Sequence, residues 1–136
     1  MEFLLQNNNW GWLAMAIASA AMLLWQTFRK QGSAISPAQA TLLINREDAV
    51  VLDVREPAEY AGGHIPKAHP FPLGQVSKRL DELQRFKDKP VIVVCRSGNR
   101  SANACGILQK ADFPNVLNLS GGMSAWEQAG LPITKK

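Results

Sequence analysis

The stretch PVIVVCRSGNRS, from Pro90 to Ser101, joins an apolar run to a loop that holds one cysteine and two arginines. The run Val91–Val94 is rich in β-branched residues and is typical of a strand buried on both faces. After Ser101 the apolar residues recur at three and four positions, which predicts a helix: they are Ala104, Ile107, Leu108 and Ala111. Cys95 is therefore expected between the end of a strand and the start of a helix.

The segments on either side of this stretch alternate between strand and helix patterns. Strands are predicted at Ala49–Val54, weakly at Ala68–Phe71, and at Asn115–Leu119; helices are predicted from Ser36 to about Asn45, at Leu73–Phe86 and at Gly121–Gly130. This alternation indicates an α/β fold, a parallel sheet with helices on both faces. The strands end in Asp53 and Arg55, in Cys95, and in Ser120–Gly122, which we expect to converge at one edge of the sheet.

Residues 10–28, WGWLAMAIASAAMLLWQTF, contain no charged residue. As a helix this segment would span roughly 28 Å, close to the thickness of the hydrocarbon core of a bilayer. Trp10, Trp12 and Trp25 lie near its two ends, where aromatic residues gather at membrane interfaces. We therefore predict a transmembrane helix at 10–28, between a short tail at 1–9 and a linker at 29–34, followed by a domain at 35–136.

Two other interpretations of this segment fit less well. A cleaved signal peptide would carry positive charge before the apolar run, but only Glu2 and the amino terminus precede it. A buried core helix would usually show a polar stripe, and this segment has almost none. Because Arg29 and Lys30 follow the run, the positive-inside rule predicts an N-terminus outside the cell and a cytoplasmic domain. We expect the cell inner membrane of a bacterium, and the small residues Ala14, Ala18 and Ala21 would allow contact with a membrane-protein partner.

The charge and the cysteine count limit the possible partners. All 15 Lys and Arg but only 10 of the 11 Asp and Glu lie after the predicted span, giving 15 − 10 = +5. This balance favours anionic lipid headgroups or small anionic substrates. Nucleic acid is not expected, because no basic run is interleaved with aromatic residues. Cys95 and Cys105 are too few for a disulfide framework, so both are expected as free thiols.

The loop after Cys95 has the features that stabilise a negative charge. The thiolate is the reactive form of cysteine, and it is favoured by the free N–H groups at the start of the following helix. Arg96 and Arg100 add positive charge, and Gly98 lets the backbone curl into an anion-binding turn. The alternative is a strand-end cysteine with solvated arginines nearby. The order of strand, Cys, Arg, Gly, Arg and helix favours a reactive anion.

Three separated motifs resemble the rhodanese family of sulfurtransferases over roughly Ile35 to Ile133. They are VLDVREPAEYAGGHIP at Val51–Pro66, VCRSGNRS at Val94–Ser101, and LSGGMSAWEQAGLP at Leu119–Pro132. The resemblance implies a five-stranded parallel sheet, and a Cys95 that takes sulfane sulfur from a donor as a persulfide. The donor would be thiosulfate, a polysulfide or glutathione persulfide, and the acceptor a thiol or cyanide. It implies neither a cofactor nor a metal.

The resemblance also suggests a role for each site residue. Cys95 is the nucleophile. The backbone of Arg96, Ser97, Gly98, Asn99 and Arg100 would surround the outer sulfur, and the two arginines would lower the thiol pKa and attract an anion. Arg100 has a second possible role, which is to pair with a carboxylate and hold the loop. Asp53 and Arg55 are expected to form a supporting ion pair. Glu59 and His64 are treated as structural, Trp126 as packing on the sheet, and Cys105 as a buried small residue.

Other functions and one departure from the family pattern stay open. Cys95 to Arg100 is C-x4-R, as in sulfur-transferring rhodaneses, whereas the related phosphatases and arsenate reductases have the longer C-x5-R. A membrane-tethered interaction or sulfur-sensing module is the main alternative, and delivery to a dedicated protein acceptor is a third. Lys67 stands where the family commonly has Gly, and His69 with Pro70 makes an unusual strand.

Overall fold

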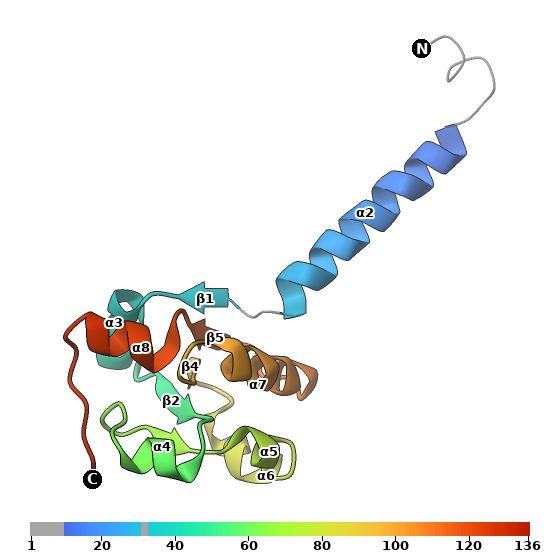
Figure 1. Ribbon diagram of the computed structural model, residues 1–136. Coiled ribbons are helices and arrows are strands. Elements are labelled where there is room, and N and C mark those ends of the chain that lie inside the picture. Colours follow the sequence, from blue (N-terminus) through green and yellow to red (C-terminus); the bar gives the residue numbers. More distant parts are fainter. Residues whose placement is uncertain (1–9, 31–32) are drawn as a thin grey trace. The chain divides into compact units, whose positions relative to one another are not determined.

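The computed structural model describes residues 10–30 and 33–136, and the chain divides into two units at the bond between Lys30 and Gln31. The predicted tail at 1–9 lies outside the described residues. The first unit contains helix α2, Trp10–Lys30, which includes the charge-free segment (Figure 1). Within the part of the chain that the structure describes, no helix is both long and apolar enough to cross a membrane. The structure therefore does not support the predicted transmembrane span.

The second unit is built on five parallel strands. They are β1 Ser33–Ile35, β2 Val50–Asp53, β3 His69–Pro70, β4 Val91–Val94 and β5 Val116–Leu119. Their order in the sheet is β1-β5-β4-β2-β3, and every pairing is parallel. This confirms the predicted five-stranded parallel sheet. It also places β4, which carries Cys95 at its end, in the centre of the sheet, where strands from both sides support it.

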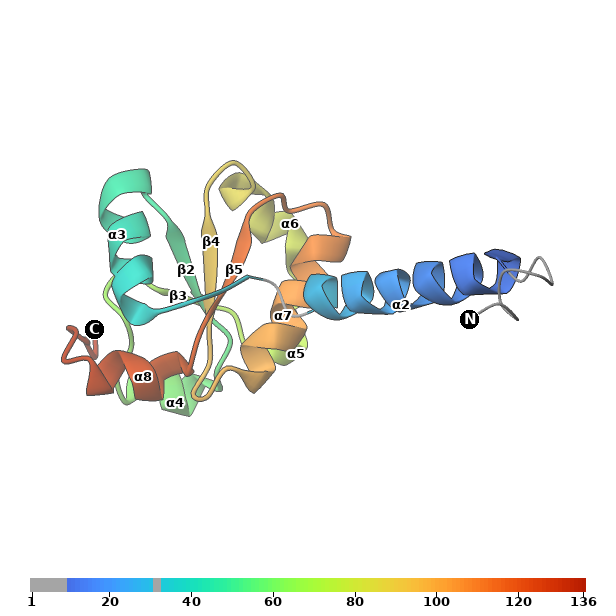
Figure 2. The same cartoon turned by 90° about the horizontal axis from the view of Figure 1, so that it is seen from above.

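Helices cover both faces of this sheet (Figure 2). The helices of the second unit are α3 Pro37–Glu47, α4 Pro57–Ala61, α5 Leu73–Val76, α6 Leu80–Leu83, α7 Asn99–Lys110 and α8 Gly122–Gln128, with a 3₁₀ turn η1 at Gln84–Phe86. In β4, Val91 and Val93 pack with α5, α6 and α7, whereas Ile92 and Val94 pack with α3 and α8. Each buried side chain of this kind contributes roughly 1.5–3 kcal/mol. The apolar run of β4 is therefore explained by burial on both faces.

Helix α3 begins where the sequence signals predict. Ser36 Oγ accepts a hydrogen bond from the Gln39 N–H at 3.2 Å, and Gln39 Oε1 accepts one from the Ser36 N–H at 2.9 Å. These two bonds satisfy backbone donors that the helix cannot use itself. Pro37 occupies the first turn, where its missing N–H costs nothing. The helix continues to Glu47, two residues beyond the predicted end.

The single helix predicted at Leu73–Phe86 is wrong. The structure has α5, α6 and η1 instead, with a turn at residues 77–78 between the first two. The apolar side chains of this segment still point inward, and Val76 and Leu83 are fully buried. Consecutive short turns place residues three or four apart on one side just as a continuous helix does, so the periodicity could not distinguish them. Arg79 then packs its guanidinium over the Phe71 ring, 4.1 Å from its centroid.

The segment that departs from the family pattern forms the edge of the sheet. Pro70 lies in β3, an edge strand of two residues, where a missing N–H is tolerated. Lys67 has a φ angle of 67°, in the left-handed region that favours glycine.

His64 is buried and stacks on Tyr60 with ring centroids 3.7 Å apart. Thr134, near the C-terminus, exchanges two backbone hydrogen bonds with His64, so the tail is held against this turn.

Candidate active site

The loop from Cys95 to Gly98 joins the centre of the sheet to α7. Gly98 caps α7 with a φ angle of 106°, a conformation that L side chains rarely adopt. This turn bends the backbone around the Cys95 side chain, and the Gly98 N–H donates a hydrogen bond to Cys95 Sγ at 2.9 Å. Cys95 itself is only 1% exposed. The cysteine therefore lies in a cup formed by its own loop.

Hydrogen bonds make this cup favourable for a thiolate. Burial alone raises the pKa of Cys95, but hydrogen bonds oppose it, and the result is a pKa below the ordinary value of a thiol. The donors are the Ser101 hydroxyl, whose oxygen is 3.4 Å from Cys95 Sγ, and the backbone N–H groups of Ser101, Gly98 and Ser97. One hydroxyl group and three backbone N–H groups thus surround Cys95 Sγ.

The main contact of the Arg100 side chain is with a carboxylate and not with the Cys95 sulfur. Its guanidinium forms two parallel hydrogen bonds with Glu59 of α4, at 2.7 and 2.9 Å. The bond from Arg100 lowers the pKa of Glu59 to about 2, and the same carboxylate raises the pKa of Arg100. The second role considered for Arg100 requires such a pairing with a carboxylate, which here ties the start of α7 to α4.

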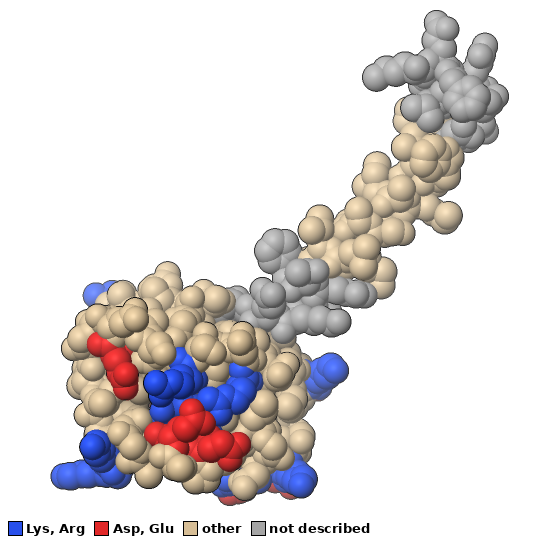
Figure 3. Space-filling view, viewed as in Figure 1, with Lys and Arg blue, Asp and Glu red and all other residues tan. Residues whose placement is uncertain are grey.

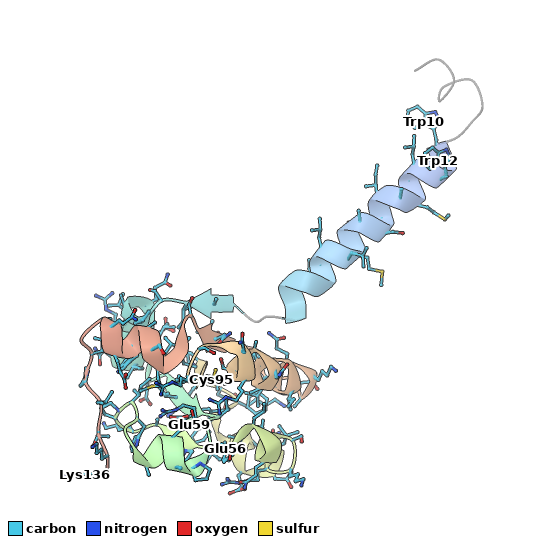
Figure 4. The ribbon with its side chains drawn as sticks, in the orientation of Figure 1. Trp10, Trp12, Glu56, Glu59, Cys95 and Lys136 are labelled. Atoms are coloured by element: carbon cyan, nitrogen blue, oxygen red, sulfur yellow. The ribbon has the colours of Figure 1, made fainter. Side chains whose placement is uncertain are left out.

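Arg96, the other arginine of the loop, differs from Arg100 in its surroundings. Its side chain is exposed, and within the described ranges no hydrogen bond or ion pair involves it. Figure 3 shows basic side chains gathered in the middle of this face of the second unit, with acidic side chains directly beside them. In the view of Figure 4, the buried Cys95 is drawn near Glu59 and Glu56 of the second unit. Of the two arginines in the loop, Arg96 is thus the one whose side chain is exposed.

Asp53 and Arg55 form a closed, buried pair at the end of β2. The guanidinium donates to Asp53 Oδ1 at 2.9 Å and to Oδ2 at 2.7 Å, and it also donates to the Gly63 carbonyl O at 2.8 Å. Their side chains are 1% and 4% exposed. Asp53 pairs with Val94 in the sheet, so the pair stands beside the cysteine-bearing strand. It braces the turn at Gly63, which fits a supporting role.

Sequence reasoning missed two buried polar residues behind the loop, Ser101 and Asn118. Ser101 Oγ lies 2.5 Å from Asn118 Oδ1 and 3.0 Å from the Gly98 carbonyl O. Asn118 Nδ2 donates to that same carbonyl at 3.3 Å. One signal was available: Asn118 interrupts the apolar strand VLNL, where a polar residue needs a buried partner. Ser97, Gly98 and Asn99 line a pocket together with Ala34, Ala102, Asn118, Ser120 and Gly121.

The start of α8 closes the loop from the other side. The Met123 N–H donates to the Cys95 carbonyl O at 2.8 Å, and the Ser124 N–H donates to the Arg96 carbonyl O at 3.2 Å. Gly122 makes this approach possible, because a Cβ atom there would lie 2.2 Å from the Cys95 carbonyl O. The strand ends that carry Cys95 and Ser120–Gly122 therefore converge, as the alternating pattern predicted.

Cys105 lies in the interior of α7 and is fully buried. Burial raises its pKa to about 12, with a smaller contribution from Cys95. A thiol of this kind stays protonated and inert at neutral pH. Among the residues that the structure describes, no group of three or more His, Cys, Asp or Glu side chains is placed to hold a metal ion.

Comparison with known proteins agrees with this geometry. The sequence profile of the rhodanese-like domain matches residues 36–129. This chain belongs to the rhodanese-like domain family. A sulfurtransferase from Allochromatium vinosum is 44% identical over 91 residues, which cover 67% of this chain and 83% of that protein. The rhodanese-like domain thus has relatives that are named sulfurtransferases.

Two further similarities show the extent of the match. The crystal structure of a rhodanese-related protein from Thermoplasma volcanium superposes with a TM-score of 0.70 and 31% identity, covering 76% of this chain and 99% of that one. The uncharacterized protein YibN of Escherichia coli is 34% identical over 125 residues, covering 91% of this chain and 87% of that protein. A match of this length extends from the rhodanese-like domain into the segment of α2.

Proposed function

We propose that this protein is a sulfurtransferase that moves sulfane sulfur through a persulfide on Cys95. The observation that carries the proposal is the set of hydrogen bonds around Cys95 Sγ, from the Gly98 N–H at 2.9 Å and from the neighbouring donors. Such a set stabilises a negative charge on the sulfur or one atom beyond it. The family membership and the relatives named sulfurtransferases support the same activity.

The proposed reaction has two steps, and neither needs an external oxidant. First, the Cys95 thiolate attacks the sulfane sulfur of the donor, and the bond that held this sulfur breaks. Its electron pair leaves with sulfite when the donor is thiosulfate, or with a thiolate when it is a polysulfide or glutathione persulfide. Second, a thiol or cyanide attacks the outer sulfur of the persulfide, and the Cys95 thiolate returns as the leaving group. The amide donors stabilise the anion in both steps.

The two arginines have different parts in this proposal. Arg96 is exposed and would attract an anionic donor to the mouth of the loop. Arg100 is held by Glu59, so it would act mainly by fixing the loop. Ser97, Gly98 and Asn99 would supply backbone contacts to the transferred sulfur.

Cyanolysis of a sulfane-sulfur donor tests this proposal. The purified full-length chain would be compared with Cys95→Ser, with thiosulfate, polysulfide and glutathione persulfide as separate donors. We expect Cys95→Ser to abolish turnover with every donor that the native protein uses. Equal rates in the two proteins would refute the proposal. Cys105→Ala is the matched control, because its buried, protonated thiol takes no part in the reaction.

We also propose, from the amino-acid sequence, that the protein resides at the bacterial inner membrane with its rhodanese-like domain in the cytoplasm. The charge-free segment before Arg29 and Lys30 motivates this proposal. Extraction of native membranes at alkaline pH tests the attachment, and protease treatment of intact cells tests the orientation. Release of the protein into the soluble fraction at neutral pH would count against it.

The alternative function is a membrane-tethered interaction or sulfur-sensing module whose turnover is incidental. One observation favours it: large apolar side chains along α2 are more than half exposed, among them Trp10, Trp12, Met15, Ile17 and Trp25. Exposed apolar surface of this kind marks a contact with lipid or with another protein. Crosslinking from α2 in native membranes distinguishes the two functions. A single specific protein partner would favour this alternative, and the absence of a specific partner would count against it.

A further inference from the structure

The hydroxyl group of Ser101 lies close to three hydrogen-bond acceptors but has one proton to donate. Its oxygen is 2.5 Å from Asn118 Oδ1, 3.0 Å from the Gly98 carbonyl O and 3.4 Å from Cys95 Sγ. Ser101 is fully buried, so its surroundings are fixed by the protein. A bond to one acceptor therefore leaves the other two without this proton.

The side-chain amide of Asn118 can take only one orientation here. Asn118 lies in β5 and is 9% exposed. Its Nδ2 donates to the Gly98 carbonyl O at 3.3 Å, and its Oδ1 then faces Ser101. The reversed amide would bring its oxygen against the Gly98 carbonyl O, and two acceptors would meet without a proton between them. Asn118 is therefore an acceptor for Ser101.

We propose that Asn118 is a positioning residue that accepts a hydrogen bond from the Ser101 hydroxyl and so keeps that hydroxyl from donating to the Cys95 sulfur. While Cys95 is a neutral thiol, Ser101 donates to Asn118 Oδ1, and the thiol can donate to Ser101 Oγ. When Cys95 ionises, its proton leaves to solvent, and the Ser101 O–H turns from Asn118 Oδ1 to Cys95 Sγ. No covalent bond changes other than the loss of the thiol proton.

This exchange sets how readily Cys95 ionises. The anion gains a charge-assisted hydrogen bond from Ser101, which is stronger than a neutral one. In return the protein gives up the bond between Ser101 and Asn118, the shortest of the three contacts. Asn118 thus opposes the thiolate, although the network that contains it also holds Ser101 next to the sulfur.

Other charged and titratable groups also lie near Cys95. They come from the loop, from α4, from α7 and from the end of β2, and they are Arg96, Arg100, Glu56, Glu59, Cys105, Asp53 and Arg55. In the described part of the chain none of these side chains is hydrogen-bonded to Asn118. A change at Asn118 therefore reaches Cys95 through Ser101 or through Gly98, whose carbonyl accepts from Asn118 and whose N–H donates to Cys95 Sγ. The Ser101→Ala background separates these two routes.

The test is a pH titration of the Cys95 thiolate by its ultraviolet absorbance, using the full-length chain with the Cys95→Ser spectrum subtracted. Cys105 contributes no signal near neutral pH, because its pKa is raised to about 12. Asn118→Ala should increase the ratio of thiolate to thiol at pH 7 by about threefold or more, the factor expected for one hydrogen bond. Ser101→Ala should decrease this ratio. In the Ser101→Ala background, Asn118→Ala should have no effect.

Asn115→Ala is the matched control, because Asn115 is exposed and immediately precedes the same strand. Its titration should equal that of the native protein. If Asn118→Ala does not fold, as judged by near-ultraviolet circular dichroism, Asn118→Ser takes its place; the shorter side chain cannot reach Ser101 in the same way, and the same increase is expected. A decrease, no change, or an equal effect with and without the Ser101 hydroxyl would overturn the proposal.

Discussion

Lys67 adopts a left-handed backbone conformation, with a φ angle of 67°, on the exposed turn before β3. A side chain with a Cβ atom crowds the following carbonyl in this conformation, and glycine does not. We expect Lys67→Gly to raise the free energy of unfolding by about 0.5–1 kcal/mol. Denaturation by urea measures this change.

Lys67→Ala is the control for this prediction. Alanine removes the charge but keeps the Cβ atom, so its stability should stay close to that of the native protein. If Lys67→Ala stabilised the chain as much as Lys67→Gly, the charge and not the backbone would be responsible.

The sequence predicted Cys95 as the candidate nucleophile, together with the loop that follows it, but it did not predict all of the contacts around this side chain. The strand, Cys95 and Gly98 lie close together in the sequence, so their arrangement follows from local structure alone. By contrast, Arg100 is paired with Glu59, which lies 41 positions away, and the sequence could not show which of its two roles applies. Ser101 and Asn118 were missed for the same reason, because their contact joins two separate elements.

At the scale of elements, the start of α8 rests directly on the Cys95 loop. A Cβ atom at Gly122 would overlap the carbonyl groups of Cys95 and Arg96, and the φ angle of 56° also disfavours a side chain. We expect Gly122→Ala to lower the free energy of unfolding by more than about 2 kcal/mol. It should also lower persulfide formation by displacing the loop.

Gly130→Ala separates the two causes. Gly130 has a similar φ angle of 71° but nothing within 4 Å of the added Cβ atom. Its substitution should cost only about 1 kcal/mol, from the backbone conformation. Equal losses at both positions would show that the close approach of α8 to the loop contributes nothing.

The ion pair between Glu59 and Arg100 connects α4 to α7, and its contribution depends on pH. The folded protein lowers the pKa of Glu59 from 4.5 to about 2. This stabilisation is complete above pH 4.5 and is lost as the pH falls toward 2. Because both side chains are partly exposed, we expect Glu59→Gln to cost about 1 kcal/mol at pH 7.

Urea denaturation of the native protein and of Glu59→Gln at several pH values tests this account. The difference in the free energy of unfolding should be constant from pH 7 to about 5 and should shrink below pH 4.5. A difference that is the same at pH 7 and pH 3 would contradict the assigned role of the carboxylate.

Elements with strong local signals were predicted well, and those without were not. The capping residues Ser36 and Gln39 located the start of α3, and the β-branched run located β4. The segment at Leu73–Phe86 has the periodicity of a helix but forms short helical pieces. The periodicity could not tell these apart, because inward-facing residues every three or four positions occur both in one long helix and in consecutive short turns. Only the tertiary packing of Val76 and Leu83 decides between them.

At the scale of the whole molecule, the rhodanese-like domain has its own core. The division between the two units falls after Lys30, and both hydrophobic clusters consist of residues from the second unit. We expect residues 31–136 to fold without α2, with a thermal midpoint within about 2 °C of that of the full chain. Differential scanning calorimetry of both proteins measures this. A domain that unfolds at a much lower temperature would show that α2 contributes to its stability.

Mass spectrometry of the full-length protein after exposure to a sulfane-sulfur donor tests the central claim, that the loop holds a sulfur anion on Cys95, most directly. The reduced protein would be incubated with thiosulfate or polysulfide, and the modified residue located in peptides. The account predicts a gain of about 32 Da, one sulfur atom, on Cys95, reversed by cyanide. No gain at Cys95, or an equal gain in Cys95→Ser, would contradict it.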